Sequence, residues 1–393
     1  MKAIFLDKDS SFSIIVAGIL SLIIGVGIAR FSFTSLLPFM LEDNLSIKFA
    51  GFLASINYIG YFIGSVAAIF IKKINTKVIF FRAGLIISII STLILGISID
   101  ERLWIISRFF AGFGTAMCLV VCSSLIMSKL KIENKTKIMG IYFSGVGFSI
   151  VVTDIIVKSI NINANLWQMS WLFLTLFSIV LFIYPWVVLS FDKKVKNSNI
   201  KISFDKRIFT PFVFIVVVAY FCEGVGFVVQ ATFLPNIIDN LEGLEGYGGL
   251  TWLFVGITGI PSSIIWMRLA HKYGSINMII LAMLIQVIGI LIPTFTNNVI
   301  LNILSGGLYG STFIGLVALF MNLGGKLSGS NPIVLMGAIT SAYSLGMILA
   351  PLYCVAFYEK YNSYDYSLYL TAIIVLFGVF ILALAKKLNI VKE

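Results

Sequence analysis

The sequence predicts an all-α integral membrane protein with twelve transmembrane helices in two pseudo-symmetric six-helix bundles. The chain is 59% hydrophobic and 11% charged, with a mean hydropathy of +1.04, whereas a soluble domain carries roughly 25% charged residues. An internal repeat is the second observation, because GVG (25–27) and LP (37–38) return as GVG (224–226) and LP (234–235), about half the 393-residue length later. Duplicated membrane bundles are typical of secondary transporters, whose substrate site lies between the repeats.

Each half contains six apolar stretches of about the 20 residues that a membrane-spanning helix needs. In the first half these stretches cover residues 13–40, 47–71, 78–99, 103–127, 138–157 and 171–189. In the second half they cover residues 208–238, 250–269, 276–295, 299–323, 333–357 and 368–385. We therefore expect an N-terminal bundle over residues 1–189, a basic connector over 190–207 and a C-terminal bundle over 208–393.

The net charge of +11 follows from where the basic residues lie. Of 28 Lys and Arg residues, 22 fall in segments that would face one side of the membrane and four in segments on the other, while Arg30 and Arg108 lie within helices. The positive-inside rule then predicts a multi-pass membrane protein with both termini in the cytoplasm. The first helix is expected to remain as a signal anchor. Because membrane topology accounts for the positive net charge, that charge is no indication of nucleic-acid binding. We expect the lipid bilayer as a partner and no nucleic acid.

The composition also argues against an integral-membrane enzyme, which is one rival class. The only histidine, His271, falls in a predicted loop, and no cluster of nucleophiles and bases is present. Two thiols without further ligands are a poor metal site, so we expect no metal and no cofactor. The cysteines are expected to pack inside helices rather than form disulfides; they are Cys118, Cys122, Cys222 and Cys354. A sensor built on a transporter fold is the other alternative.

Two local patterns resemble the major facilitator superfamily. Residues 108–116, RFFAGFGTA, resemble the superfamily pattern R-x-x-Q-G-x-G-x-A, with alanine in place of glutamine. Residues 268–274, RLAHKYG, resemble its loop G-x-L-A-D-R-x-G-R between the eighth and ninth helices. In that loop Met267 replaces the first glycine and His271 replaces the acidic residue.

A narrower resemblance runs through essentially the whole chain. The sequence is similar to signature segments of the YbfB/YjiJ branch of bacterial major facilitator proteins at GIARF (27–31), LP (37–38), ASINYIGY (54–61), YFCEGVG (220–226) and TFLP (232–235). This resemblance implies the major facilitator fold, solute transport by alternating access and a place in the bacterial inner (plasma) membrane. It implies no particular solute.

Four charged residues inside the predicted helices are the strongest indications of mechanism: Arg30, Arg108, Asp154 and Glu223. A charge at the centre of a membrane helix costs roughly 2.5 to 3.5 kcal/mol on insertion scales, so it persists where it is paired or faces a polar cavity. At 1.5 Å per residue, Arg30 and Glu223 lie about 12 and 18 Å below the helix ends that we expect near Pro38 and Pro235. We therefore consider all four for proton coupling.

Two pairings follow from these depths. Arg108 and Asp154 are expected at similar depth in neighbouring helices. Two interpretations of this pair are open: a structural ion pair, or a relay for a proton or substrate. Arg30 and Glu223 lie in the repeat-related first and seventh helices, which the fold would turn toward a central cavity. Apolar surroundings favour a protonated carboxyl group and a nearby arginine favours an ionised one, so an approach of Arg30 to Glu223 would link transport to protons. Alternatively, Glu223 only bonds backbone groups freed by the adjacent glycines.

Small residues supply the candidates for gating. They are either contacts that let helices approach closely or flexible points of a moving interface: Gly27, Gly112, Gly114 and Gly226. Arg268 and Gly274, in the loop pattern, are further gating candidates.

Polar and aromatic residues within the helices supply a candidate substrate site. Besides Arg30, they are Asn57, Tyr58, Tyr61, Tyr142, Gln230, Gln286 and Tyr343. Each also suits an ordinary hydrogen bond between helices, and we expect about half of them to contact substrate. Two buried arginines favour an anionic or zwitterionic solute. The sequence thus predicts a monomeric, proton-linked transporter of a small organic solute, with import and export both open.

Overall fold

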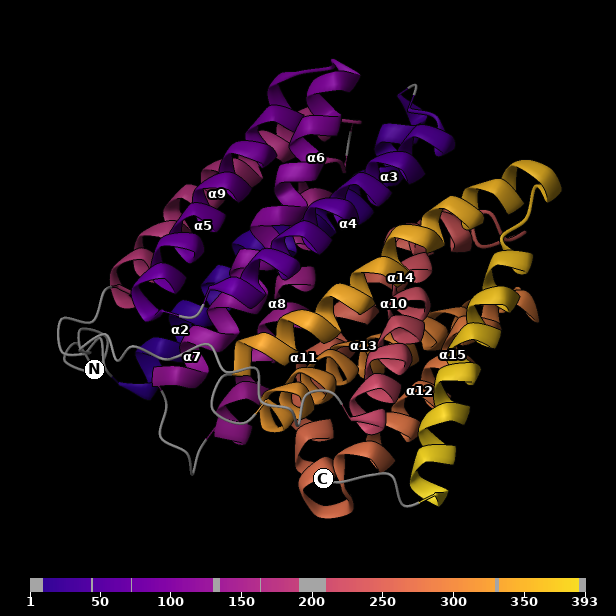
Figure 1. Ribbon diagram of the computed structural model, residues 1–393. Coiled ribbons are helices and arrows are strands. Elements are labelled where there is room, and N and C mark those ends of the chain that lie inside the picture. Colours follow the sequence, from indigo (N-terminus) through magenta and orange to yellow (C-terminus); the bar gives the residue numbers. More distant parts are fainter. Residues whose placement is uncertain are drawn as a thin grey trace.

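The computed structural model confirms the all-helical membrane architecture (Figure 1). It describes residues 10–43, 45–71, 73–129, 135–162, 164–190, 210–328 and 332–388. Within these residues, 12 helices are long and apolar enough to cross a membrane. The expected connector over 190–207 lies outside the described residues, apart from Ser190.

The first six spans include two that are interrupted by π-helix. The first span consists of α2 (Ser11–Leu22), the π-helical η1 (Ile23–Phe31) and α3 (Ser32–Glu42). The fourth consists of α6 (Glu101–Ala116), the π-helical η2 (Met117–Val121) and α7 (Cys122–Lys129). The other four are α4 (Ile47–Phe70), α5 (Ile74–Ile97), α8 (Lys135–Ile160) and α9 (Trp167–Val188).

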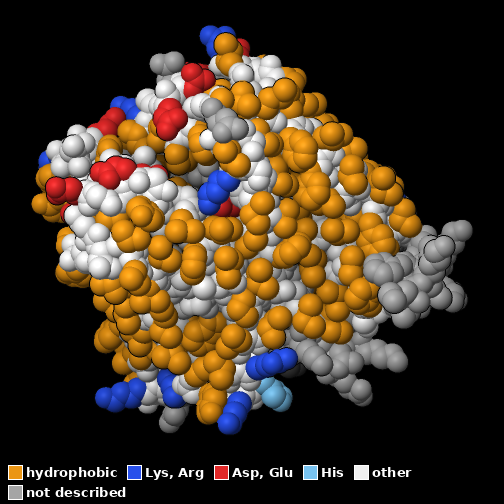
Figure 2. All heavy atoms as spheres, turned by 180° about the vertical axis from the view of Figure 1, so that it is seen from behind, with side chains coloured by type: hydrophobic (Ala, Val, Ile, Leu, Met, Phe, Trp, Pro, Cys, Tyr) orange, Lys and Arg blue, Asp and Glu red, His pale blue; other side chains and the backbone are white. Residues whose placement is uncertain are grey.

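The last six spans follow in the same order along the chain. They are α10 (Pro211–Asp239), α11 (Gly248–Tyr273), α12 (Ser275–Leu291) with the short 3₁₀-helix η5 (Ile292–Thr294), α13 (Val299–Leu327), α14 (Pro332–Tyr361) and α15 (Asp365–Lys387). Figure 1 shows the first six spans, indigo to magenta, beside the last six, salmon to yellow. Figure 2 shows a surface that is hydrophobic over most of its height, with charged side chains toward its two ends.

Polar side chains fix where several spans begin. In four spans the residue before the helix accepts a hydrogen bond from the backbone N–H three residues later, which satisfies an otherwise unpaired donor; these residues are Ser10, Ser46, Thr210 and Asn298. Gly274, with a φ of 87°, ends α11 and is the only residue between α11 and α12. The loop expected at 268–274 is therefore helix up to Tyr273, and Arg268 lies on the exposed side of α11.

The third span begins earlier than the sequence predicted, at Ile74 rather than at residue 78. This difference brings Lys77 into the helix, where its side chain is 6% exposed and donates to the Ser124 hydroxyl at 2.8 Å. Arg82, one turn further on, donates to the Trp186 carbonyl at 2.7 Å and lies over the Trp186 ring. Lys77 and Arg82 are thus bonded within the bundle, although both belong to the 22 basic residues that were assigned to one side of the membrane.

Glycines allow the helices of each half to touch backbone to backbone. A Cβ atom at Gly112 would lie 1.8 Å from the Asn57 carbonyl oxygen, where α6 crosses α4. A Cβ atom at Gly310 would lie 2.2 Å from the Val255 carbonyl oxygen, where α13 crosses α11. Both partners in the second contact lie 198 residues after those in the first, so the repeat in sequence is also a repeat in packing.

The two halves meet along two pairs of spans. Between α4 and α14, Ser55 donates to the Ile348 carbonyl at 3.3 Å. Between α8 and α11, Ser263 donates to the Gly140 carbonyl at 2.7 Å. These two seams flank the centre of the molecule, where the first span faces α10.

We expect Gly112→Ala to lower the free energy of unfolding by about 1–3 kcal/mol, because the new methyl group would overlap the Asn57 carbonyl. Gly307→Ala is the matched control, since its Cβ would meet only the Thr258 side chain, at 3.7 Å, and alanine favours helix. Thermal unfolding of the detergent-solubilised variants measures both effects. Equal stability of the two variants would contradict the close contact.

Candidate functional site

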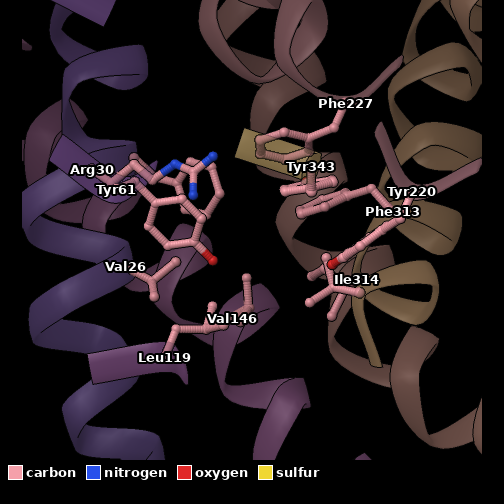
Figure 3. Close-up of a pocket in the computed structure, with 12 residues that line it drawn as sticks. Val26, Arg30, Tyr61, Leu119, Val146, Tyr220, Phe227, Phe313, Ile314 and Tyr343 are labelled. Carbon is pink, nitrogen blue, oxygen red and sulfur yellow. The ribbon is translucent and has the colours of Figure 1, made fainter. Parts of the chain in front are cut away.

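A closed cavity lies between the two halves and is lined equally by both (Figure 3). The space between protein atoms in and around it, open solvent included, amounts to about 370 Å³. The first half contributes Val26, Arg30, Phe31, Tyr61, Leu119 and Val146. The second half contributes Tyr220, Phe227, Phe313, Ile314, Val317 and Tyr343.

The two π-helical segments carry four of the lining residues. Arg30 and its neighbours Val26 and Phe31 belong to η1, and Leu119 belongs to η2. The segments pack tightly, since a Cβ atom at Gly25 would lie 2.4 Å from Cys118 Cβ. Local π-helix within an α-helix occurs often at functional sites, and here it shapes one wall of the cavity.

Residues of α6 hold the backbone of η1 in place. The Thr115 hydroxyl donates to the Gly25 carbonyl at 2.6 Å, and Arg108 Nη1 donates to the Ala29 carbonyl at 2.9 Å. Arg108 also lies over the Phe33 ring, 4.6 Å from its centroid. Because Ala29 directly precedes Arg30, the Arg108 guanidinium positions the segment that carries the cavity's only charge.

Arg30 has no carboxylate partner among the described residues. Its side chain is 5% exposed, and the hydrogen bond described for it runs from Nη2 to the Met347 sulfur, at 3.0 Å. Its Nε is buried and unbonded. Four rings surround the guanidinium carbon at 4.9 to 5.4 Å, those of Phe31, Tyr58, Tyr61 and Phe227. Cation–π contacts stabilise a desolvated cation by about 2 kcal/mol, but they leave its charge without a counterion.

Stacked aromatic rings form the opposite wall. Tyr220 stacks on Tyr343 with ring centroids 4.5 Å apart and planes 25° apart. Phe227 and Phe313 extend this wall, with centroids 5.2 Å apart. Behind them the Tyr309 hydroxyl donates to the Phe227 carbonyl at 2.6 Å, which fixes the position of that ring's helix.

Both ends of the cavity are closed by contacts between the halves. Toward Pro38, the Thr34 hydroxyl donates to the Ala231 carbonyl at 2.5 Å, and the Tyr58 hydroxyl lies 3.0 Å from that of Thr232. Toward the Lys129 end, Met127 packs against Gly325, whose Cβ would lie 3.2 Å from the methionine methyl. The structure therefore shows an occluded cavity.

The predicted ion pair between Arg108 and Asp154 is wrong. Asp154, 1% exposed, pairs instead with Lys158 on the same helix, at 2.5 Å. Lys158 also donates to the Gly249 carbonyl of α11. Helix geometry explains the difference, because residues four apart share a face, and the long lysine side chain reaches both groups. This cluster joins the two halves away from the cavity.

Arg30 and Glu223 also do not pair in this structure. Glu223 is fully buried and accepts a hydrogen bond from Gln286 Nε2 at 3.1 Å, while its second oxygen has no bond among the described residues. It therefore faces α12 rather than the cavity, one turn behind the lining residue Tyr220. The partner of Glu223 is an amide, not a cation.

Three of the eight predicted binding residues line the cavity: Arg30, Tyr61 and Tyr343. Tyr58 lies beside it, over Arg30. The other four bond helices together: Asn57 donates to the Arg108 carbonyl, Tyr142 to the Cys118 carbonyl, Gln230 to the Gly289 carbonyl and Gln286 to Glu223. Tyr220 was missed, although it is a tyrosine within a predicted membrane helix, the same signal that singled out Tyr61 and Tyr343.

The predicted gating glycines pack within their own halves. A Cβ atom at each would lie 1.8 to 2.6 Å from an atom of a neighbouring helix, so they act as close contacts; they are Gly27 on Ser149, Gly112 on Asn57, Gly114 on Ser88 and Gly226 on Val375. Gly274 is a helix end with positive φ. All four cysteines are buried and free. No three His, Cys, Asp or Glu residues within the described ranges come together as metal ligands.

The fold and the enclosed, shared cavity define the class of the protein, a multi-pass membrane transporter. The chain belongs to the major facilitator family whose model is described as "Uncharacterised MFS-type transporter YbfB", which matches residues 22–383. Among solved structures, a crystal structure of the nucleoside transporter NupG is similar, with a TM-score of 0.70 and 11% sequence identity, over 95% of this chain and 98% of that one. At this identity the likeness shows the fold alone. A comparison with curated proteins finds no match.

We expect Lys158→Met to destabilise the protein by about 1–3 kcal/mol, because it leaves the buried Asp154 carboxylate without its partner. Adding Asp154→Asn should restore most of the loss, since the charge that needs the partner is then gone. Thermal unfolding of the single and double variants measures this coupling. Lys48→Met is the control, because Lys48 and Glu359 form an exposed pair that contributes little.

Proposed function

We propose that this transporter moves a small organic anion together with a proton, by alternating access. The observation that carries the proposal is the Arg30 guanidinium, which is buried in the cavity and has no carboxylate partner among the described residues. A buried cation without a counterion is unfavourable. An anionic group of the solute would supply that counterion and gain charge-assisted hydrogen bonds.

Alternating access is supported by the position of the contacts that close the cavity. The Thr34–Ala231 contact closes one end and the Met127–Gly325 contact closes the other. Opening either set alone would expose the same cavity to one side of the membrane, as in transporters built from repeats.

Glu223 is our first candidate for carrying the proton. Its carboxyl group is fully buried, its one bonded oxygen meets an amide, and the other oxygen has no bond. An ionised carboxylate in such a place costs several kcal/mol, so proton binding and release there would require movement of α10 against α12. Tyr220 of α10 lines the cavity, so solute binding against Tyr220 would act on Glu223 through movement of that helix. Asp154, paired with Lys158, is the second candidate.

The distribution of charge supports the expected topology. Lys129 and Lys326 end two spans on the same side, where the sequence places most basic residues. In the view of Figure 2, acidic side chains gather toward one end together with some lysine and arginine side chains, whereas the charged side chains visible at the other end are basic, with the histidine beside them. By the positive-inside rule the basic end faces the cytoplasm. We accordingly propose a monomer in a bacterial inner membrane, with both termini cytoplasmic.

We expect Glu223→Gln to abolish solute-dependent proton flux, because the amide cannot release a proton. The measurement uses proteoliposomes with an entrapped pH dye and a panel of organic acids, amino acids, sugars and organic cations. Glu359→Gln is the matched control and should keep native flux, since Glu359 lies at the surface. Native flux in Glu223→Gln would make Glu223 structural and Asp154 the next residue to change.

We expect Arg30→Gln to reduce uptake of the anion found in that panel by at least about tenfold, the loss of one charge-assisted contact worth roughly 1.5–3 kcal/mol. Arg30→Lys keeps the charge but not the planar fork, and should retain part of the activity. Initial rates in proteoliposomes, together with thermal unfolding, separate lost transport from lost folding. Undiminished uptake in a folded Arg30→Gln protein would refute anion binding at Arg30.

A further inference from the structure

We propose that the cavity binds a single-ring aromatic monocarboxylate, with its carboxylate on Arg30 and its ring against the aromatic wall of the second half. This inference rests on the proposed transport of an anion and adds the chemical class of that anion. It is carried by the lining residues, by the stacking geometry of their rings and by three tyrosine hydroxyls.

The charge of the lining fits one negative charge and no positive charge. Of the twelve lining residues, Arg30 is the only cation and none is acidic. A dicarboxylate would bury a second negative charge without a partner, and an amino acid would bury an ammonium group without a carboxylate. Both arrangements are costly in a desolvated site. Only a monoanion neutralises the charge of Arg30 without burying a further unpaired charge.

The shape of the second-half wall fits a flat ring. Four of its six lining residues are aromatic: Tyr220, Phe227, Phe313 and Tyr343. Their neighbouring centroids lie 4.5 to 5.7 Å apart, within the range that favours offset stacking and edge contacts. Figure 3 shows this wall facing Arg30 and Tyr61 across the cavity. A ligand ring would continue the stack, whereas a saturated ring would only fill volume.

The cation and the aromatic wall adjoin at one point. The Arg30 guanidinium carbon lies 5.0 Å from the centroid of the Phe227 ring. A carboxylate bonded to Arg30 would therefore hold its attached ring beside Phe227. One short, flat molecule therefore reaches both features.

Three tyrosine hydroxyls add polar groups to the lining of the cavity. Tyr61, Tyr220 and Tyr343 line the cavity, and in the described part of the chain their hydroxyls form no hydrogen bond, unlike that of Tyr309. An unbonded hydroxyl in an apolar interior is unfavourable. A hydroxyl substituent on the ligand ring would bond to one or more of them, so a hydroxybenzoate is the best-matched probe.

The test is calorimetric titration of the purified full-length protein with five probes. We expect 4-hydroxybenzoate to bind most tightly and benzoate about three- to tenfold more weakly, for the loss of one hydrogen bond. Cyclohexanecarboxylate, with the same charge but no flat ring, should bind about tenfold more weakly than benzoate. The neutral 4-hydroxybenzamide and the dianion terephthalate should bind at least about a hundredfold more weakly than 4-hydroxybenzoate.

Variants assign each preference to its residues. Phe313→Leu keeps an apolar side chain and should bring benzoate and cyclohexanecarboxylate to within about twofold of each other. Among Tyr61→Phe, Tyr220→Phe and Tyr343→Phe, at least one should remove the advantage of 4-hydroxybenzoate over benzoate. Thermal unfolding of each variant establishes that it is folded.

The outcomes separate this inference from the proposed function. If cyclohexanecarboxylate binds as tightly as benzoate and also drives proton flux, the aromatic class is wrong and anion transport stands. If none of the aromatic acids binds the native protein, the inference is wrong whatever other solute is transported. If 4-hydroxybenzamide binds as tightly as 4-hydroxybenzoate, anion recognition fails and both proposals fall with it.

Discussion

The hydrocarbon core of a membrane supplies no water, so every backbone polar group within it must be satisfied by the protein itself. That constraint explains the twelve helices and also the way polar side chains are used. Thr115 and Arg108 donate to carbonyls of η1, and Tyr309 donates to a carbonyl of α10. In each case a side chain on one span satisfies backbone on another. The same bonds that complete the hydrogen bonding also position the walls of the cavity.

The two halves have the same packing but contribute different chemistry to the cavity. The first half contributes a cation on a π-helical segment, whose carbonyls are held by α6. The second half contributes a wall of stacked rings on α10, α13 and α14. Substrate contact therefore requires both halves at once. This division suits alternating access, because a solute bridging the two walls stabilises the closed state over either open one.

The sequence predicted the spans well because a run of apolar residues long enough to cross a bilayer has few other interpretations. It located Arg30, Tyr61 and Tyr343 because charge and aromatic polarity inside such a run are rare. It failed on partners. Arg108 was assigned to Asp154 by depth, whereas the rotation of each helix about its axis decides contact: Arg108 faces η1 and Asp154 faces Lys158. Phe227 and Phe313 were missed since phenylalanine is common throughout the chain, which contains 34.

The repeat explains why the second half has no arginine at the position opposite Arg30. In the register set by the two LP segments (37–38 and 234–235), which is 197 residues rather than the 199 of the two GVG segments, Arg30 is equivalent to Phe227 and Thr34 to Ala231, and each pair is in contact. Equivalent positions that touch lie at the pseudo-symmetry axis between the halves. A second arginine at 227 would place two guanidinium groups about 5 Å apart, a repulsion of about 3 kcal/mol at an effective dielectric constant near 20. An aromatic ring at position 227 instead stabilises the Arg30 cation through a cation–π contact with the face of the ring. The duplicated fold can therefore hold a single charge at its centre only by breaking the symmetry of its sequence, and Phe227 marks where it does so.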